Sequence, residues 1–198
     1  MLDELRTGDM IAFKKSRNIF SKLVHVFTHS NVNHVALVVK LYNRNGKGFP
    51  FIIEANENDG VEYHYLPTKL AKTESELYVY KLTDENLDKI DRKINKFYQY
   101  ANEQIGKAYS VPDAIETVLD KLFDKTITKD DFEEFICSIL VGALYQYVGV
   151  ITPAMLKESG FQCVSELTPV DCCKLPIFKE EIKLDKNILK GDHLCQQV

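Results

Sequence analysis

The chain has 198 residues, 45% of them apolar, and a formal net charge of −4. This length and apolar content suffice for one domain with a sizeable core, and no Pro/Gly/Ser-rich linker divides the chain. Acids and bases are interspersed without a basic stripe, which argues against nucleic-acid binding.

The N-terminus and the cysteines indicate a reducing compartment. The first residues, MLDELRTGDM, carry acids and no apolar segment, unlike a signal peptide, so we expect a cytoplasmic rather than a secreted protein. The five cysteines are odd in number and include no Cys-x-x-Cys pair, which predicts reduced thiols rather than disulfides or a zinc site. We therefore expect no metal and no other cofactor.

The N-terminal half predicts antiparallel strands. A short apolar strand at Met10–Phe13 precedes helical spacing over Asn18–His29. The β-branched run NHVALVVKL, Asn33–Leu41, predicts a strand buried on both faces. The Asn/Gly-rich segment Asn43–Gly48 then forms a hairpin to a partner strand, Phe51–Ala55. VEYHYL and LYVYKL extend the pattern, so we expect an antiparallel meander.

The second half predicts helices. Apolar residues recur at three and four from Thr83 to Gly106, which indicates one long amphipathic helix, and a shorter helix follows over Pro112–Phe123. A third helix is expected to begin at a Thr128 cap and to carry Cys137. TPAMLKESG and LTPVDCCKL predict helical turns opened by Thr-Pro, and EEIKL a final strand.

These elements indicate an α+β fold in which a small antiparallel sheet packs against helices. We expect a single domain over residues 1–189, with a helical insertion at about 111–130 and a flexible tail at 190–198. The uncharged stretch Phe135–Leu156 approaches the length of a membrane span, but glycines, a glutamine and a proline interrupt it. We therefore expect a buried helix here, with peripheral membrane contact as the alternative.

Two polar residues stand on the apolar strands. Side chains alternate along a strand, so His34 shares a face with Ala36 and Val38. Glu54 closes FIIEA on the same face as Ile52, where a carboxylate is costly unless another group bonds it. If the hairpin forms, Glu54 lies near His34 and can orient its imidazole. Without this pairing, His34 would be a hydrogen-bonded structural histidine and Glu54 a solvated carboxylate.

Cys137 is either an inert buried thiol or a nucleophile. In a helix that starts at Thr128 it falls at the edge of the apolar stripe, which suits a cleft. It would also lie too deep in that helix for help from the N-terminal dipole, and the acids at Asp130, Asp131, Glu133 and Glu134 oppose a thiolate. Its activation would then depend on His34.

These motifs, in this order, resemble the permuted branch of the NlpC-type papain-like enzymes. The matching segments are LRTGDMIAF, HSNVNHVALVV, IIEANENDGV, GKAYS and FICSILVGALYQYVGV. The branch includes YiiX-like bacterial proteins, a poxviral family and, more remotely, lecithin retinol acyltransferase. The sequence departs from it where Ala-Leu follows the histidine and Ser-Ile-Leu follows the cysteine.

The resemblance implies a papain-like fold and a Cys-His-Glu triad. Cys137 would be the nucleophile, His34 the base and Glu54 the orienting residue, with Tyr109 lining the substrate cleft. It also implies a bacterial or viral protein, found in the host cytoplasm or virion if viral. His64 is an alternative third member, because a second histidine serves there in the acyltransferase relatives.

We therefore expect a cysteine-dependent hydrolase or acyltransferase that attacks an amide, ester or thioester through an acyl-cysteine. Its substrate would be a small molecule, a peptide or a lipid acyl group. The alternative is a non-catalytic module that binds a lipid or amino acid in the same cleft. A third possibility is a metal-binding or scaffold role through His25 and His29, which stand four residues apart on a predicted helix but lack an evident third ligand.

Overall fold

The core of the protein is a six-stranded antiparallel sheet. We use a computed structural model that describes residues 2–14, 31–56, 59–109 and 134–185. Side by side, the strands are β4 (Gly60–Tyr65), β3 (Gly48–Asn56), β2 (Val32–Tyr42), β1 (Met10–Lys14), β5 (Glu76–Leu82) and β8 (Phe178–Lys183). The mixed helix and antiparallel sheet confirm the α+β prediction.

The predicted meander holds for the first four strands only. Strands β1 to β4 pair in chain order, and β2 pairs with β3 through Leu37–Ile53 and Val38–Ile52. β5, which contains LYVYKL, pairs instead with β1. The reason is helix α2 (Leu66–Lys72), which follows β4 directly and precedes β5 on the opposite side of the sheet order.

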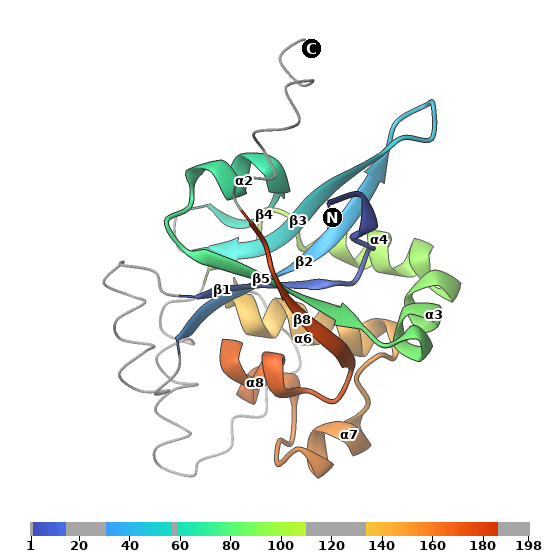
Figure 1. The fold of residues 1–198 in the computed structure, drawn as a ribbon. Coiled ribbons are helices and arrows are strands. Elements are labelled where there is room, and N and C mark those ends of the chain that lie inside the picture. Colours follow the sequence, from blue (N-terminus) through green and yellow to red (C-terminus); the bar gives the residue numbers. More distant parts are fainter. Residues whose placement is uncertain (1, 15–30, 57–58, 110–133, 186–198) are drawn as a thin grey trace.

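The sheet separates two apolar cores (Figure 1). Residues 35–39 of β2 are completely buried, as the β-branched run predicted for a strand covered on both faces. One core contains α2 and the short helix η1 (Leu2–Glu4). The other contains α3 (Asp84–Arg92), α4 (Ile94–Gln104), α6 (Cys137–Val148), α7 (Pro153–Glu158), η2 (Val164–Glu166) and α8 (Pro169–Lys174).

The helix expected from Thr83 to Gly106 is two helices. Thr83 caps α3 as predicted, since its side chain accepts a hydrogen bond from the Asn86 N–H. The backbone leaves helical geometry at Lys93, with φ −119° and ψ 23°, and α4 begins at the next residue. The apolar spacing continues across the break, which is why the pattern alone predicted one helix.

The C-terminal predictions are confirmed. Thr152 accepts a hydrogen bond from Met155 N–H at the start of α7, and Thr168 forms a capping box with Asp171 at the start of α8. Both helices have a proline in the first turn. The EEIKL segment belongs to β8.

The helix that carries Cys137 starts later than predicted. Glu134–Phe135 form a short strand, β7, which pairs in parallel with β6 (Ala108–Tyr109). The next residue, Ile136, is extended, and α6 begins at Cys137. A continuous helix from Thr128 through Cys137 is therefore wrong, because backbone pairing with β6 holds the preceding residues in a strand.

Other predictions lie outside the described residues. These are the helices at 18–29 and 112–123, the insertion at 111–130 and the tail at 190–198. Within the described part, α6 packs inside one apolar core, and no helix there is long and apolar enough to cross a membrane.

Gly60 brings the segment before β6 against β4. Its φ of +72° suits glycine, and a Cβ at this position would lie 2.3 Å from the carbonyl oxygen of Lys107. This close approach accompanies two backbone hydrogen bonds, from Val61 N to Lys107 O and from Gly106 N to Val61 O, both 2.9 Å. The turn at Gly60 thus fixes the segment that leads into β6, and β6 in turn pairs with the strand before Cys137.

We predict that Gly60→Ala destabilises the protein more than Gly46→Ala. Both glycines have positive φ, but a Cβ on Gly46 meets no described atom within 4 Å. Gly46→Ala should cost only backbone strain, about 1 kcal/mol, whereas Gly60→Ala adds a backbone clash of about 2 kcal/mol. Chemical denaturation of the two variants tests this; equal losses of unfolding free energy would contradict the close approach.

Candidate active site

Cys137 is the first residue of helix α6. Ile136 is the N-cap residue, has extended geometry and provides no side-chain cap. The first helical hydrogen bond runs from Leu140 N to Ile136 O, so the N–H groups of Cys137 and Ser138 have no acceptor within the helix. The Cys137 side chain lies at the start of a 12-residue helix and is 4% exposed.

This position reverses part of the sequence-based expectation. Cys137 was expected deep in a helix and at the edge of its apolar stripe, yet it begins a helix that is buried on nearly all sides. The N-terminal end of a helix carries partial positive charge, which favours a thiolate there. The acids Asp130, Asp131 and Glu133, which were expected to oppose it, lie outside the described residues.

His34 lies near the start of β2, across from Phe13 of β1. The two rings pack edge to face with centroids 4.9 Å apart. The Nε2 atom of His34 lies 2.6 Å from Oε2 of Glu54, and the ring also hydrogen-bonds the Cys137 side chain. Because Glu54 occupies Nε2, Nδ1 is the ring nitrogen left for the thiol. The His34 side chain is 21% exposed.

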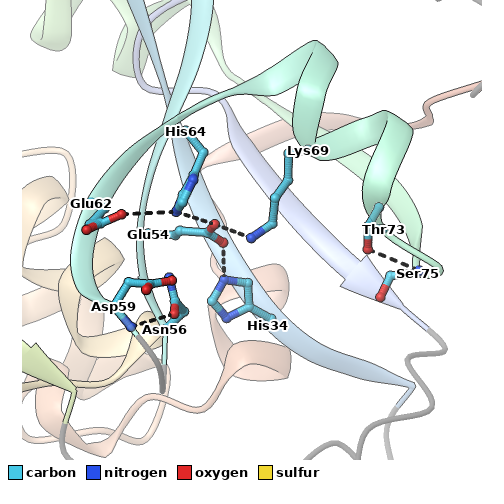
Figure 2. A network of polar contacts seen from close by, with 9 residues as sticks. All are labelled: His34, Glu54, Asn56, Asp59, Glu62, His64, Lys69, Thr73 and Ser75. Atoms are coloured by element: carbon cyan, nitrogen blue, oxygen red, sulfur yellow. Dashed lines mark hydrogen bonds and ion pairs between the residues drawn. The ribbon is translucent and has the colours of Figure 1, made fainter.

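Glu54 is completely buried and has basic partners on both carboxylate oxygens (Figure 2). Oε2 faces His34, while Oε1 accepts a hydrogen bond from the ammonium group of Lys69. His64 Nε2 lies 3.3 Å from the same Oε1 and 3.9 Å from Oε2 of Glu62. The β2–β3 register extends to set Glu54 opposite Ala36, two residues from His34 on the same face.

These contacts shift the pKa values of His34 and Glu54 in opposite directions. Burial alone would raise the pKa of Glu54, but the bonds and charges of His34 and Lys69 outweigh it and lower that pKa to about 2. Burial alone would lower the pKa of His34, but Cys137 and Glu54 outweigh it and raise that pKa to about 10. These shifts favour a charged imidazole between the Cys137 sulfur and the Glu54 carboxylate.

The structure places His34 against Glu54 and beside the Cys137 side chain, while the catalytic roles of the three residues stay predictions. His64 lies beside Glu54, but His34 donates its hydrogen bond to Glu54 and not to His64. Tyr109 lies on β6, whose backbone pairs with Phe135 just before the cysteine. Its side chain is outside the described part of the structure, so its place in the cleft stays a prediction.

Lys69 was not among the predicted site residues. This residue lies on α2, between the buried Leu66 and Leu70, which pack the helix into the apolar core. The available signal was Pro67, because a proline directly after a strand predicts a new helix that turns the chain away from the sheet edge. A lysine next to the buried face of that helix could then have been considered as a partner for Glu54.

A metal site was considered from His25 and His29, which both lie outside the described residues. Within the described residues, no group of three or more His, Cys, Asp or Glu side chains is arranged to hold a metal ion.

An antiparallel sheet packed against a helix that begins with cysteine defines the class as papain-like, with the histidine strand ahead of the cysteine helix in the chain. The family model described as permuted papain-like amidase enzyme, YaeF/YiiX, C92 family, matches residues 4–164. The chain belongs to this family.

Two further comparisons were made. The crystal structure of metalloprotein YiiX from Escherichia coli O157:H7 is similar to this chain, with a TM-score of 0.55 and 20% identity. The similarity covers 91% of this chain and 96% of that one, and it supports the shared fold. The search of curated proteins gave no match.

We predict that Glu54 makes stability depend on acid pH. The pKa of Glu54 falls from 4.5 to about 2 on folding. Its contribution to the free energy of unfolding is therefore complete at a pH above the pKa of the unfolded chain and is lost as the pH falls towards 2. Glu54→Gln should be less stable than the wild type by on the order of 3 kcal/mol at pH 6, and the two should converge near pH 2.

Chemical denaturation at several pH values measures this convergence. Glu85→Gln is the matched control, because the Glu85 side chain is 80% exposed and pairs only with Lys89 of the same helix in the described contacts. The unfolding free energy of Glu85→Gln should differ from that of the wild type by close to zero at every pH. A Glu54→Gln difference that does not change between pH 6 and pH 2 would contradict the ionised, paired carboxylate.

Proposed function

We propose that this protein is a cysteine-dependent hydrolase or acyltransferase that attacks an amide, ester or thioester carbonyl through an acyl-Cys137 intermediate. The observation that carries the proposal is the placement of His34, which bonds the Cys137 side chain and, at 2.6 Å, the buried carboxylate of Glu54. Membership in a family of permuted papain-like amidases supports the same chemistry.

In the first half of the reaction, the proton of the Cys137 thiol lies on His34, so that a thiolate faces the charged imidazole. The sulfur attacks the substrate carbonyl carbon, and the carbonyl oxygen takes the negative charge. The N–H groups at the start of α6 have no acceptor within the helix, and that of Cys137 is the first candidate donor to this oxyanion. His34 then gives its proton to the leaving amine, alcohol or thiol, the carbon–heteroatom bond breaks, and the acyl group stays on Cys137.

In the second half, neutral His34 accepts a proton from water or from an acceptor alcohol or amine. The resulting nucleophile attacks the thioester carbon, and the C–S bond breaks. The sulfur leaves as a thiolate beside the charged His34, which restores the free enzyme. Throughout, Glu54 holds the ring by Nε2 and stabilises its charged form. Water gives hydrolysis, and an alcohol or amine gives acyl transfer.

An amide is the first substrate class to test, because the family is one of amidases. A lipid acyl ester was expected from the uncharged stretch around Cys137. In the structure, however, α6 packs into the apolar core, so this stretch is explained by burial. A lipid acyl group is retained as the second class to test.

We predict that iodoacetamide labels Cys137 faster than the other cysteines. Cys173 is an internal control, because burial, the largest effect on it, raises its pKa to about 12. His34→Ala should slow the labelling of Cys137 by about a hundredfold, the usual contribution of a positioned base. His64→Ala is the matched control, since it removes an imidazole beside Glu54 but leaves His34 in place.

Peptide mass mapping over a time course gives each rate. Fast labelling that His34→Ala abolishes and His64→Ala preserves supports the proposal. If Cys137 reacts no faster than Cys173, the reactive thiol is disproved and a non-catalytic binding module becomes the better explanation. An equal loss in both histidine variants would contradict the assignment of His34 as the base.

The acyl intermediate itself should be visible by intact mass. Brief incubation with a panel of activated amides, aryl esters and acyl thioesters should add one acyl group to the wild type and none to Cys137→Ala. The chain length and polarity that give the most adduct identify the substrate class. An adduct that persists in Cys137→Ala would place the chemistry elsewhere.

A further inference from the structure

Lys69 binds the carboxylate oxygen that His34 does not use. The Lys69 ammonium group donates to Oε1 of Glu54, while His34 Nε2 lies 2.6 Å from Oε2 (Figure 2). The two partners come from helix α2 and strand β2, so they hold the carboxylate from two separate elements. With a partner on each oxygen, the carboxylate is fixed with Oε2 towards His34.

The packing of helix α2 holds Lys69 close to Glu54. Leu66 and Leu70, both completely buried, anchor α2 in the apolar core, and Lys69 stands between them in the chain. Its ammonium group also lies 5.7 Å from the centre of the Phe13 ring, which packs against His34. The Lys69 side chain is only 28% exposed. Lysine and imidazole thus bind one buried carboxylate, and the aromatic ring of Phe13 packs against the imidazole.

We propose that Lys69 is a positioning residue that keeps Glu54 an ionised acceptor when His34 is neutral. The proposal rests on the proposed function, in which His34 loses its proton to the leaving group. At that stage a buried carboxylate without another cation would take up a proton. Protonated Glu54 would donate to Nε2 of His34 and so force the proton of the neutral ring onto Nδ1.

That tautomer cannot accept a proton at Nδ1, the nitrogen left for Cys137. With Lys69 in place, Glu54 stays an acceptor, neutral His34 carries its proton on Nε2, and Nδ1 is free to act as the base. His64 is a weaker candidate for this role, because its Nε2 is 3.3 Å from Glu54, is shared with Glu62 at 3.9 Å, and is cationic only when protonated. The Lys69 ammonium group, by contrast, donates a hydrogen bond directly to Oε1 of Glu54.

The test is the pH dependence of Cys137 alkylation in Lys69→Met. As the pH is lowered, the alkylation rate should fall off at a pH about one unit higher than in the wild type, because Glu54 takes up its proton at a higher pH. Lys69→Arg, which keeps the charge, should retain the wild-type profile. Lys72→Met is the matched control, because Lys72 lies on the same helix and is exposed. A Lys69→Met profile identical to the Lys72→Met profile would overturn the proposal.

Carbon-13 NMR of the Glu54 carboxyl group is a second readout that needs no reactive cysteine. The pH midpoint of the Glu54 titration should rise by about one unit or more in Lys69→Met, and an unchanged midpoint would overturn the role of Lys69. If wild-type Cys137 proves unreactive at every pH, the proposed function fails, while this titration still decides the role of Lys69. If Lys69→Met does not fold, Lys69→Gln replaces it in both experiments. A wild-type Glu54 that titrates at the ordinary value of a glutamate would also overturn the proposal.

Discussion

The site depends on one constraint, the burial of an ionised carboxylate. Glu54 is inaccessible to solvent at the end of an apolar strand, a position that costs several kcal/mol unless the charge is paired and bonded. The structure meets this cost with groups from two elements beside β3: His34 on β2 and Lys69 on α2. The orientation of His34 follows from this pairing, because its Nε2 is committed to Glu54 and its other nitrogen is left for the thiol.

The second requirement is that Cys137 should begin its helix. The β6–β7 pairing keeps Glu134 and Phe135 extended, so that α6 starts with the cysteine and its first N–H groups have no acceptor inside the helix. Gly60 supports this arrangement from a distance, since only a residue without Cβ lets β4 approach Lys107 so closely. The proposed nucleophile, its proposed base and the proposed oxyanion donors are thus positioned by backbone pairing as much as by side chains.

Local patterns in the sequence predicted much of this, and contacts between distant segments account for what they missed. Alternation along two apolar strands and an Asn/Gly hairpin were enough to place His34 near Glu54. The start of α6 was wrong because two-residue strands leave no periodicity, and the break at Lys93 was missed because the apolar spacing continues through it. Lys69 reaches Glu54 only through the packing of α2, and no local pattern marks such a contact.

The most direct test of the account is the protonation state of His34 in the wild-type protein. NMR of the imidazole nitrogens, with the signal assigned through His34→Gln, reports this state over the whole pH range. The account predicts a ring that stays charged through neutrality and titrates near pH 10, because Cys137 and Glu54 outweigh the effect of burial. A His34 ring that titrates near its ordinary value of about 6.5 would contradict a charged imidazole held between the thiol and the carboxylate.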